Sequence, residues 1–112
     1  MTKDEGYLKH ILDAISDIEQ FVSGLSQEDF FRSREKQYAV LRALEIIGEA
    51  TKNLSTELKS NYSEINWKKI AGMRDKLIHA YFAVDLPLVW ETLRIDIPNL
   101  KKQARKILKN CQ

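Results

Sequence analysis

The chain has 112 residues, of which 44% are hydrophobic and 30% are charged, and its formal net charge is +2. That length and composition favour one folded domain spanning 1–112 and exclude an intrinsically disordered chain. No apolar run approaches about 18 residues, which excludes a membrane-spanning helix. The start of the chain lacks the pattern of a signal peptide, so we expect a cytoplasmic protein. With one cysteine, Cys111, and two histidines, an internal disulfide is impossible and we expect no metal site and no cofactor.

The first part of the chain predicts a long amphipathic helix over residues 3–24, followed by a short one. Apolar residues recur at steps of three and four, and they are Leu8, Ile11, Leu12, Ile15, Ile18 and Val22. Gly24 marks the end of this helix, and Ser26 is placed to cap the next one. That short helix carries Phe30 and Phe31, which we expect in the core or in subunit packing. His10 lies off the apolar stripe and is expected at the surface.

A second long helix is predicted from about residue 35 to residue 59. Its apolar stripe consists of Tyr38, Leu41, Leu44, Ile47, Thr51, Leu54 and Leu58. Gly48 lies beside the stripe, and because glycine costs a helix about 1 kcal/mol relative to alanine, we expect it to allow close approach by another helix. Glu49 falls near the same stripe, either lining a cleft or as a solvated carboxylate.

The polar stretch 61–66 predicts a break, after which Asn66 or Ile65 precedes another helix. Its buried side is expected to include Trp67, Ile70, Met73 or Arg74, Leu77 and Ile78. Lys68, Lys69 and Lys76 add positive charge along it. They are candidate contacts to the phosphate backbone of a nucleic acid, although a solvated helix face has the same appearance.

The last part of the chain carries two helix-start signals. Asp85-Leu86-Pro87 places a capping aspartate before a proline in the first turn, and Asp96-Ile97-Pro98 repeats the pattern, which predicts a kink or short break. The final helix is expected to bury Leu100, Ala104, Ile107 and Leu108. Its other side holds Lys101, Lys102, Arg105, Lys106 and Lys109, either as a surface that guides a nucleic acid or, as we favour, as cations suited to a helix C-terminus.

One stretch, residues 73–81, concentrates the side chains that carry chemistry. His79 is able to exchange a proton near neutral pH, and the planar guanidinium of Arg74 suits a phosphate group. Asp75 lies four residues before His79, so that on a helix its carboxylate would orient the imidazole. Tyr81 adds a hydroxyl that is open to modification. Together these groups suit metal-independent cleavage of RNA, in which a base, a cation and an acid act around one phosphodiester.

The spacing raises a geometric problem. At about 100° per residue, Arg74 and Tyr81 share one helical stripe while His79 lies roughly 140° away from Arg74. Either the helix loosens near Tyr81, or Arg74 reaches round it, or a second subunit completes the site.

The stretch resembles the Arg-x4-His-x-Tyr signature of the HepT-like branch of the HEPN superfamily. The resemblance extends to residues 47–50, 67–72, 89–91 and 96–98, in the same order along the chain. It implies an all-α antiparallel helical bundle with about four main helices plus short ones, acting as a homodimer.

The resemblance also implies a function. Arg74 and His79 would be the catalytic pair of a metal-independent ribonuclease, with Asp75 beside them, and RNA would be the substrate. The protein would be the toxin of a type VII-like toxin–antitoxin pair whose partner is an MntA-like nucleotidyltransferase. That partner would transfer AMP to Tyr81 and so block cleavage. The alternative is a non-catalytic subunit that binds a nucleotide or docks the nucleotidyltransferase.

Overall fold

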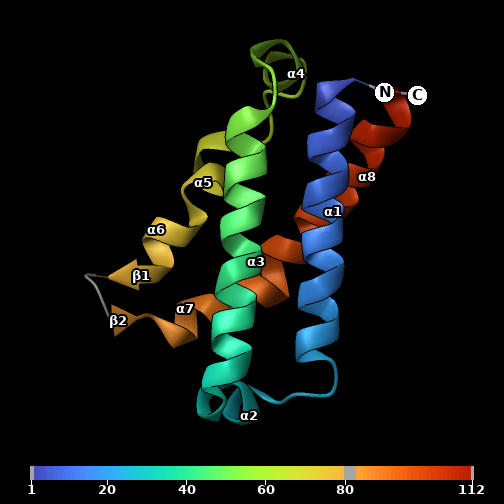
Figure 1. Cartoon of the computed structure of the whole chain (residues 1–112). Coiled ribbons are helices and arrows are strands. Elements are labelled where there is room, and N and C mark those ends of the chain that lie inside the picture. The colour runs from blue at the N-terminus through green and yellow to red at the C-terminus, as the bar shows by residue number, and fades with distance from the viewer. Residues whose placement is uncertain (1, 80–82, 112) are drawn as a thin grey trace.

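The computed structural model describes residues 2–79 and 83–111. Three long helices form its frame: α1 (Lys3–Val22), α3 (Arg34–Asn53) and α8 (Ile97–Cys111). Helix α1 packs along both α3 and α8, and the two chain ends lie close together (Figure 1). The expected all-α class is confirmed, with one exception, a pair of very short strands described below.

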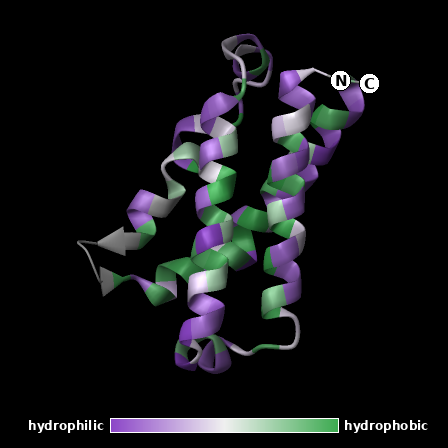
Figure 2. Ribbon diagram, viewed as in Figure 1, coloured by the Kyte–Doolittle hydropathy of each residue, from purple (hydrophilic) through white to green (hydrophobic). Residues whose placement is uncertain are grey.

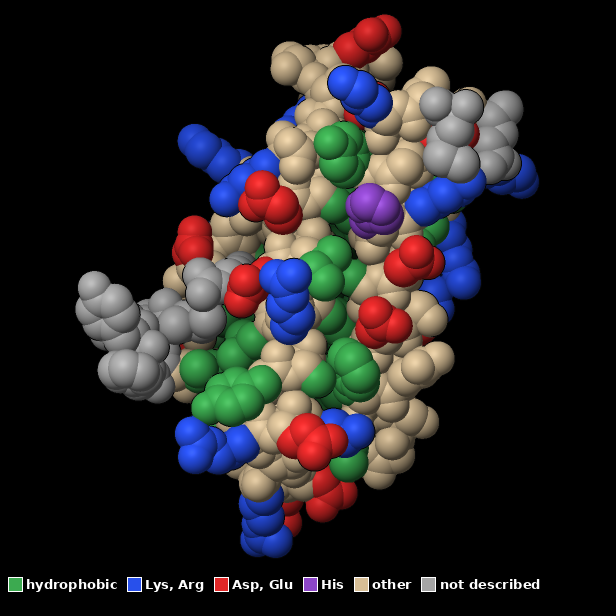
Figure 3. Space-filling view, in the orientation of Figure 1, with side chains coloured by type: hydrophobic (Ala, Val, Ile, Leu, Met, Phe, Trp, Pro, Cys, Tyr) green, Lys and Arg blue, Asp and Glu red, His purple; other side chains and the backbone are tan. Residues whose placement is uncertain are grey.

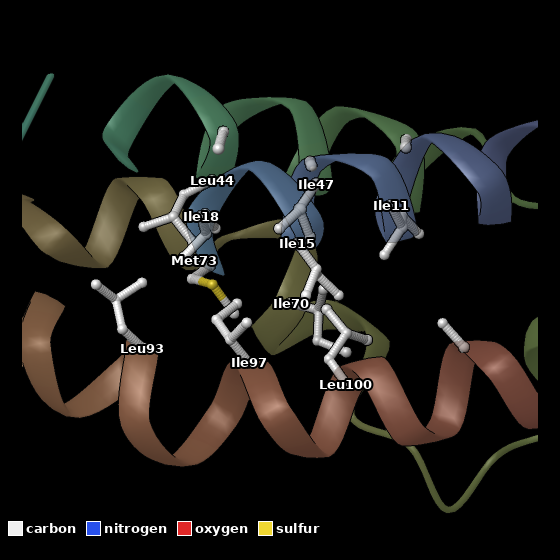
Figure 4. Packing of buried hydrophobic residues seen from close by; sticks show 14 of the residues in the cluster. Ile11, Ile15, Ile18, Leu44, Ile47, Ile70, Met73, Leu93, Ile97 and Leu100 are labelled. Atoms are coloured by element: carbon white, nitrogen blue, oxygen red, sulfur yellow. The ribbon is translucent and has the colours of Figure 1, made fainter. Parts of the chain in front are cut away.

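A single hydrophobic core holds these helices together. Figure 4 shows side chains from α1, α3 and α8 meeting those of the shorter helices between them. The apolar stripes predicted for the first and last helices are buried, including Ile11, Ile15 and Ile18 on one side and Leu100, Ala104 and Ile107 on the other. Hydropathy follows the same division: green, hydrophobic positions gather along α7 (Leu86–Glu91) and the chain after it, interrupted by charged residues such as Glu91 and Arg94, while purple, hydrophilic positions recur along α1 and α3 (Figure 2).

The expected turn between the first two helices is confirmed. Helix α1 ends at Val22, and Gly24 adopts a φ of 76°, a left-handed conformation that glycine tolerates best. Ser26 then caps α2 (Gln27–Arg32): its hydroxyl accepts from the Asp29 backbone N–H, and the Asp29 carboxylate accepts from the Ser26 N–H. Phe30 is fully buried with its ring centroid 5.5 Å from that of Trp90, which places it in the core.

The prediction of one helix over 35–59 is wrong, because the chain breaks at Leu54 and Ser55. Helix α3 ends at Asn53, and a separate α4 (Thr56–Asn61) follows. Ser55 caps α4 by accepting from the Leu58 N–H. Its own N–H and hydroxyl donate to the Asp4 carboxylate at 2.8 and 2.6 Å, which ties the start of α4 to the start of α1.

The two helix-start signals in the last third of the chain differ in outcome. Asp85 caps α7 as expected, accepting from the Leu88 N–H at 3.1 Å. At the second signal the chain does not break: a π-helical turn, η1 (Thr92–Asp96), runs directly into α8. A proline ring clashes with the carbonyl four residues before it, here that of Arg94, and the wider π turn makes room for it.

Within the described residues, no helix is both long and apolar enough to cross a lipid bilayer.

Candidate functional site

The segment that carries the candidate site residues is built from two short helices. Asn66 caps α5 (Trp67–Ala71) by accepting from the Lys69 N–H, and the Trp67 indole donates to the Tyr62 carbonyl at 3.1 Å. After Gly72 the chain starts again as α6 (Met73–Leu77). The single helix expected here is therefore two helices, although the predicted start at Asn66 is confirmed.

Gly48 lets this segment approach α3 closely, as the sequence predicted. A Cβ atom at position 48 would lie 3.0 Å from the carbonyl oxygen of Ala71, a backbone atom at the end of α5. Ile70, Met73 and Leu77 are buried on the same segment and hold it against the core. The backbone of Arg74 thus lies in a helix that is anchored immediately on both sides.

The helical relationship expected between Asp75 and His79 does not hold. Helix α6 ends at Leu77, and His79 belongs to strand β1 (Ile78–His79), which pairs antiparallel with β2 (Ala83–Val84). The Asp85 N–H donates to the Leu77 carbonyl at 2.9 Å below this hairpin. The chain must reverse within a few residues to reach α7, which a continuing helix would prevent. Of the three arrangements that the sequence left open, the structure is closest to the first, in which the helix loosens before Tyr81.

The structure thus places the backbones of Arg74 and His79 on α6 and β1, with only Asp75 to Ile78 between them. Tyr81, the expected modification site, lies outside the described residues.

A groove of about 510 Å³ runs beside the site segment, between α1, α3 and the α5–α6 turn. Among the residues lining it are Arg42, Glu45, Glu49, Ala71 and Asp75. Glu49 is also exposed, so it fits both alternatives given for it, a residue that lines a cleft and a solvated carboxylate. Arg42 Nη1 lies 3.6 Å from Glu45 Oε2 in an exposed pair. His10 is exposed, as predicted, and lies on the far wall of the groove. The volume is within the range of small-molecule sites, about 300–1,000 Å³.

The three candidate lysines do not share one environment. Lys69 lies 3.7 Å from the Asp96 carboxylate and so contacts the π-helical turn. Lys68 and Lys76 are exposed. Lys69 and Lys76 also line a second hollow of about 330 Å³ with Met73, Leu77 and Ile95. Helix α6 therefore lies between two hollows of mixed charge, one with three carboxylates and two cations and one with two lysines, Glu91 and Asp96.

The structure corrects the sequence analysis at Tyr38. The apolar stripe placed it on the buried side of α3, but it is 59% exposed, while Val40, Leu41 and Leu44 take the buried positions. Arg34 Nη2 donates to the Tyr38 hydroxyl at 2.9 Å, and the guanidinium lies 5.7 Å from the ring centroid. The spacing of Arg34, Tyr38 and Arg42 at intervals of four residues was the available signal of an exposed stripe.

No group of three or more histidine, cysteine, aspartate or glutamate side chains suited to a metal ion occurs in the part of the chain that the structure describes.

Comparison with known families identifies the class of protein. A family model described as "Ribonuclease HepT-like" matches residues 11–107. The chain belongs to this HepT-like family, and the resemblance noted in the sequence is confirmed.

Named relatives agree with the family. A "probable ribonuclease HepT" of Thermococcus cleftensis is 50% identical over 103 residues, covering 92% of this chain and 94% of that protein. A "putative RNase" of Caldanaerobacter subterraneus subsp. tengcongensis is 49% identical over 102 residues, 91% of each chain. A Methanocaldococcus jannaschii protein named "gamma-glutamylcyclotransferase and putative RNase" is 50% identical over 102 residues, 91% of this chain but 46% of its own length. No solved structure shows a significant match.

Proposed function

We propose that this protein is a metal-independent endoribonuclease and the toxin of a type VII-like toxin–antitoxin pair. Membership of the HepT-like family and relatives named as ribonucleases support the proposal. The observation that carries it is the placement of the Arg-x4-His segment. Buried Met73 and Leu77 fix α6 beside the groove, and the chain turns straight from α6 into the strand that holds His79.

The reaction we propose uses the RNA's own 2′-hydroxyl. One imidazole removes its proton, the 2′-oxygen attacks the neighbouring phosphorus, and the bond to the 5′-oxygen breaks as that oxygen receives a proton. The products are a 2′,3′-cyclic phosphate and a free 5′-hydroxyl. We assign proton transfer to His79 and the neutralisation of charge on the phosphate to Arg74. Because one imidazole does not serve as base and acid in the same step, we propose a homodimer in which two copies of His79 face one cleft.

Asp75 is assigned to orienting and charging His79 from four residues away along the chain, since a carboxylate near an imidazole stabilises the imidazolium. Because α6 ends at Leu77, this assignment does not rest on the helical spacing expected from the sequence. Lys68 and Lys76 are exposed near the segment and are assigned to attracting the RNA backbone. Lys69 is already 3.7 Å from Asp96, so we expect it to contribute less. Substituting Asp75 by asparagine should lower cleavage and shift its pH profile, whereas a purely structural role would leave the profile in place.

The partner in this proposal is an MntA-like nucleotidyltransferase that attaches AMP to Tyr81. The adduct would add bulk and negative charge two residues from His79 and so repel the phosphates of RNA. Incubation with the nucleotidyltransferase and ATP should raise the mass of the wild-type protein by whole AMP units and stop cleavage. Tyr81→Phe should stay unmodified and active under the same conditions.

Expression in cells tests the proposal. Wild type should arrest growth, and His79→Ala, produced in equal soluble amount, should not. Full growth arrest by His79→Ala would contradict the catalytic assignment. If wild type neither arrests growth nor cuts RNA, and its mass is unmodified, a melting temperature raised by ATP would favour the non-catalytic nucleotide-binding or docking subunit.

A further inference from the structure

An exposed aromatic ring stands between two arginines on the outer face of α3. Tyr38 is 59% exposed, one of two large hydrophobic side chains so exposed among the described residues. Arg34 and Arg42 lie four residues before and after it, and because residues four apart share a helix face, the three form one stripe. Figure 3 shows this α1–α3 side of the molecule, where hydrophobic side chains lie among charged ones.

The contacts within the stripe fix the position of the Tyr38 ring and leave much of its surface exposed to solvent. Arg34 donates to the Tyr38 hydroxyl at 2.9 Å and lies 5.7 Å from the ring centroid, so it occupies one side of the ring and restricts its rotation. The Arg42 side chain is 72% exposed, and its 3.6 Å ion pair with Glu45 is an exposed contact of a kind that contributes little in water. An exposed aromatic ring flanked by arginines is a combination found in sites that bind single-stranded nucleic acid, where bases stack and phosphates are neutralised.

The stripe leads to the candidate active site. Arg42 also lines the groove beside α6, together with Asp75. Gly48, where α3 meets the end of α5, is ten residues beyond Tyr38, about 15 Å along the helix axis. A strand lying on the stripe would therefore reach the Arg74–His79 segment within a few nucleotides.

The charges of the groove indicate which part of the RNA enters it. The three carboxylates in its lining, those of Glu45, Glu49 and Asp75, outnumber the two cations, Arg42 and Lys52. Carboxylates repel phosphates but accept hydrogen bonds from the amino groups of bases. The backbone of the strand therefore suits the arginine stripe, and a base suits the groove.

We propose that single-stranded RNA binds along the exposed face of α3, with one base stacked on Tyr38 and its phosphates contacted by Arg34 and Arg42, and that this face delivers the strand to the Arg74–His79 segment. This inference rests on the proposed ribonuclease function and adds the site that holds the substrate. Double-stranded RNA does not fit, because its bases are already stacked on one another.

Binding of a fluorescent single-stranded oligoribonucleotide to the full chain, in a His79→Ala background that prevents cleavage, tests the inference. Tyr38→Ala should weaken binding by about 5- to 150-fold, the range expected for loss of one stacked base. Tyr38→Phe should bind almost as the parent does, because it keeps the ring. Arg42→Gln should lower the slope of log Kd against log salt by about 0.7, the value for one phosphate contact on a single strand. The exposed Arg105→Gln on α8 is the matched control and should leave both quantities unchanged.

Two results would overturn the inference. In one, the α3 face does not bind RNA: either Tyr38→Ala binds RNA as tightly as the parent, or Arg105→Gln weakens binding while the α3 variants do not. The second of these outcomes would indicate that RNA binds the basic face of α8. In the other, sedimentation shows that Tyr38→Ala separates a dimer into monomers, which would make this face a subunit interface. Cleavage by the otherwise wild-type chain is measured in parallel. RNA binding along α3 without cleavage would contradict the proposed ribonuclease function and support the binding face. Cleavage with a normal KM in Tyr38→Ala and Arg42→Gln would support the ribonuclease function and contradict the binding face.

Discussion

Substituting Gly48 by alanine tests the close packing that positions the candidate site. A helix interior normally gains about 1 kcal/mol when alanine replaces glycine. At position 48, however, the new Cβ would lie 3.0 Å from the Ala71 carbonyl oxygen and 3.7 Å from its carbonyl carbon. These are backbone atoms, so α5 itself must move by a few tenths of an ångström. Overpacking of this kind costs about 1–3 kcal/mol, which leaves Gly48→Ala less stable than wild type by about 0–2 kcal/mol.

The chain offers a matched control in Gly6. This glycine also lies within a helix, α1, and a Cβ there would meet nothing within 4 Å. Gly6→Ala should therefore stabilise the protein by about 0.5–1 kcal/mol. Chemical denaturation of both variants, read by circular dichroism, measures the difference directly. Equal stabilisation by the two substitutions would refute the reasoning, because it would mean that α3 and α5 are not in contact at Gly48. Since α5 leads into α6, Gly48→Ala should also cleave RNA more slowly than Gly6→Ala.

The remaining predictions concern the end of the molecule away from the site segment. Asp4→Ala removes both hydrogen bonds to Ser55, at 2.8 and 2.6 Å, and should lower the free energy of unfolding in urea by about 1–3 kcal/mol. Asp17→Ala, at an exposed position, should change that free energy by less than about 0.5 kcal/mol. Equal effects of the two substitutions would show that the contact with Ser55 contributes nothing. Cys111 is exposed, but partial desolvation at the end of α8, followed by the charges of Glu5 and Asp4, raises the pKa of its thiol above the ordinary value of 9.0. Alkylation of Cys111 should therefore accelerate at higher pH than for a free thiol, and Glu5→Gln should move that rise to lower pH. A rise at or below the ordinary value would show that these groups do not act on the thiol.

Most of the long helices followed from local signals in the sequence. The apolar stripe of α1, the capping box of Ser26 and Asp29 and the Asp85 cap act within a few residues, and all are found in the structure. The break between α3 and α4 was not predictable in this way. Ser55 is fixed there by Asp4, 51 residues earlier in the chain, and no periodicity within one segment reports such a contact.

At the candidate site the sequence predicted the residues better than their geometry. Gly48 was correctly expected to allow close approach of another helix, because glycine within a helix is costly unless it serves packing. The helix that was to hold Asp75 and His79 on one face ends at Leu77 instead. The hairpin that replaces it pairs Ile78 with Val84, and the Asp85 N–H donates to the Leu77 carbonyl beside it. A helical periodicity within one segment does not report these contacts. Tyr38 was misplaced because an aromatic residue in a helical pattern is usually buried, whereas here the contact with Arg34 keeps it at the surface.

The proposed function requires that the Arg74–His79 segment cuts RNA without a metal ion. The most direct measurement is cleavage of labelled single-stranded RNA by the purified protein in excess chelator, with wild type, His79→Ala and His10→Ala compared side by side. His10 and His79 are the two histidines of the chain, so each variant is the control for the other. The account predicts cleavage by wild type and His10→Ala, with 2′,3′-cyclic phosphate ends, and none by His79→Ala. Cleavage that disappears with chelator, or that persists in His79→Ala, would contradict it.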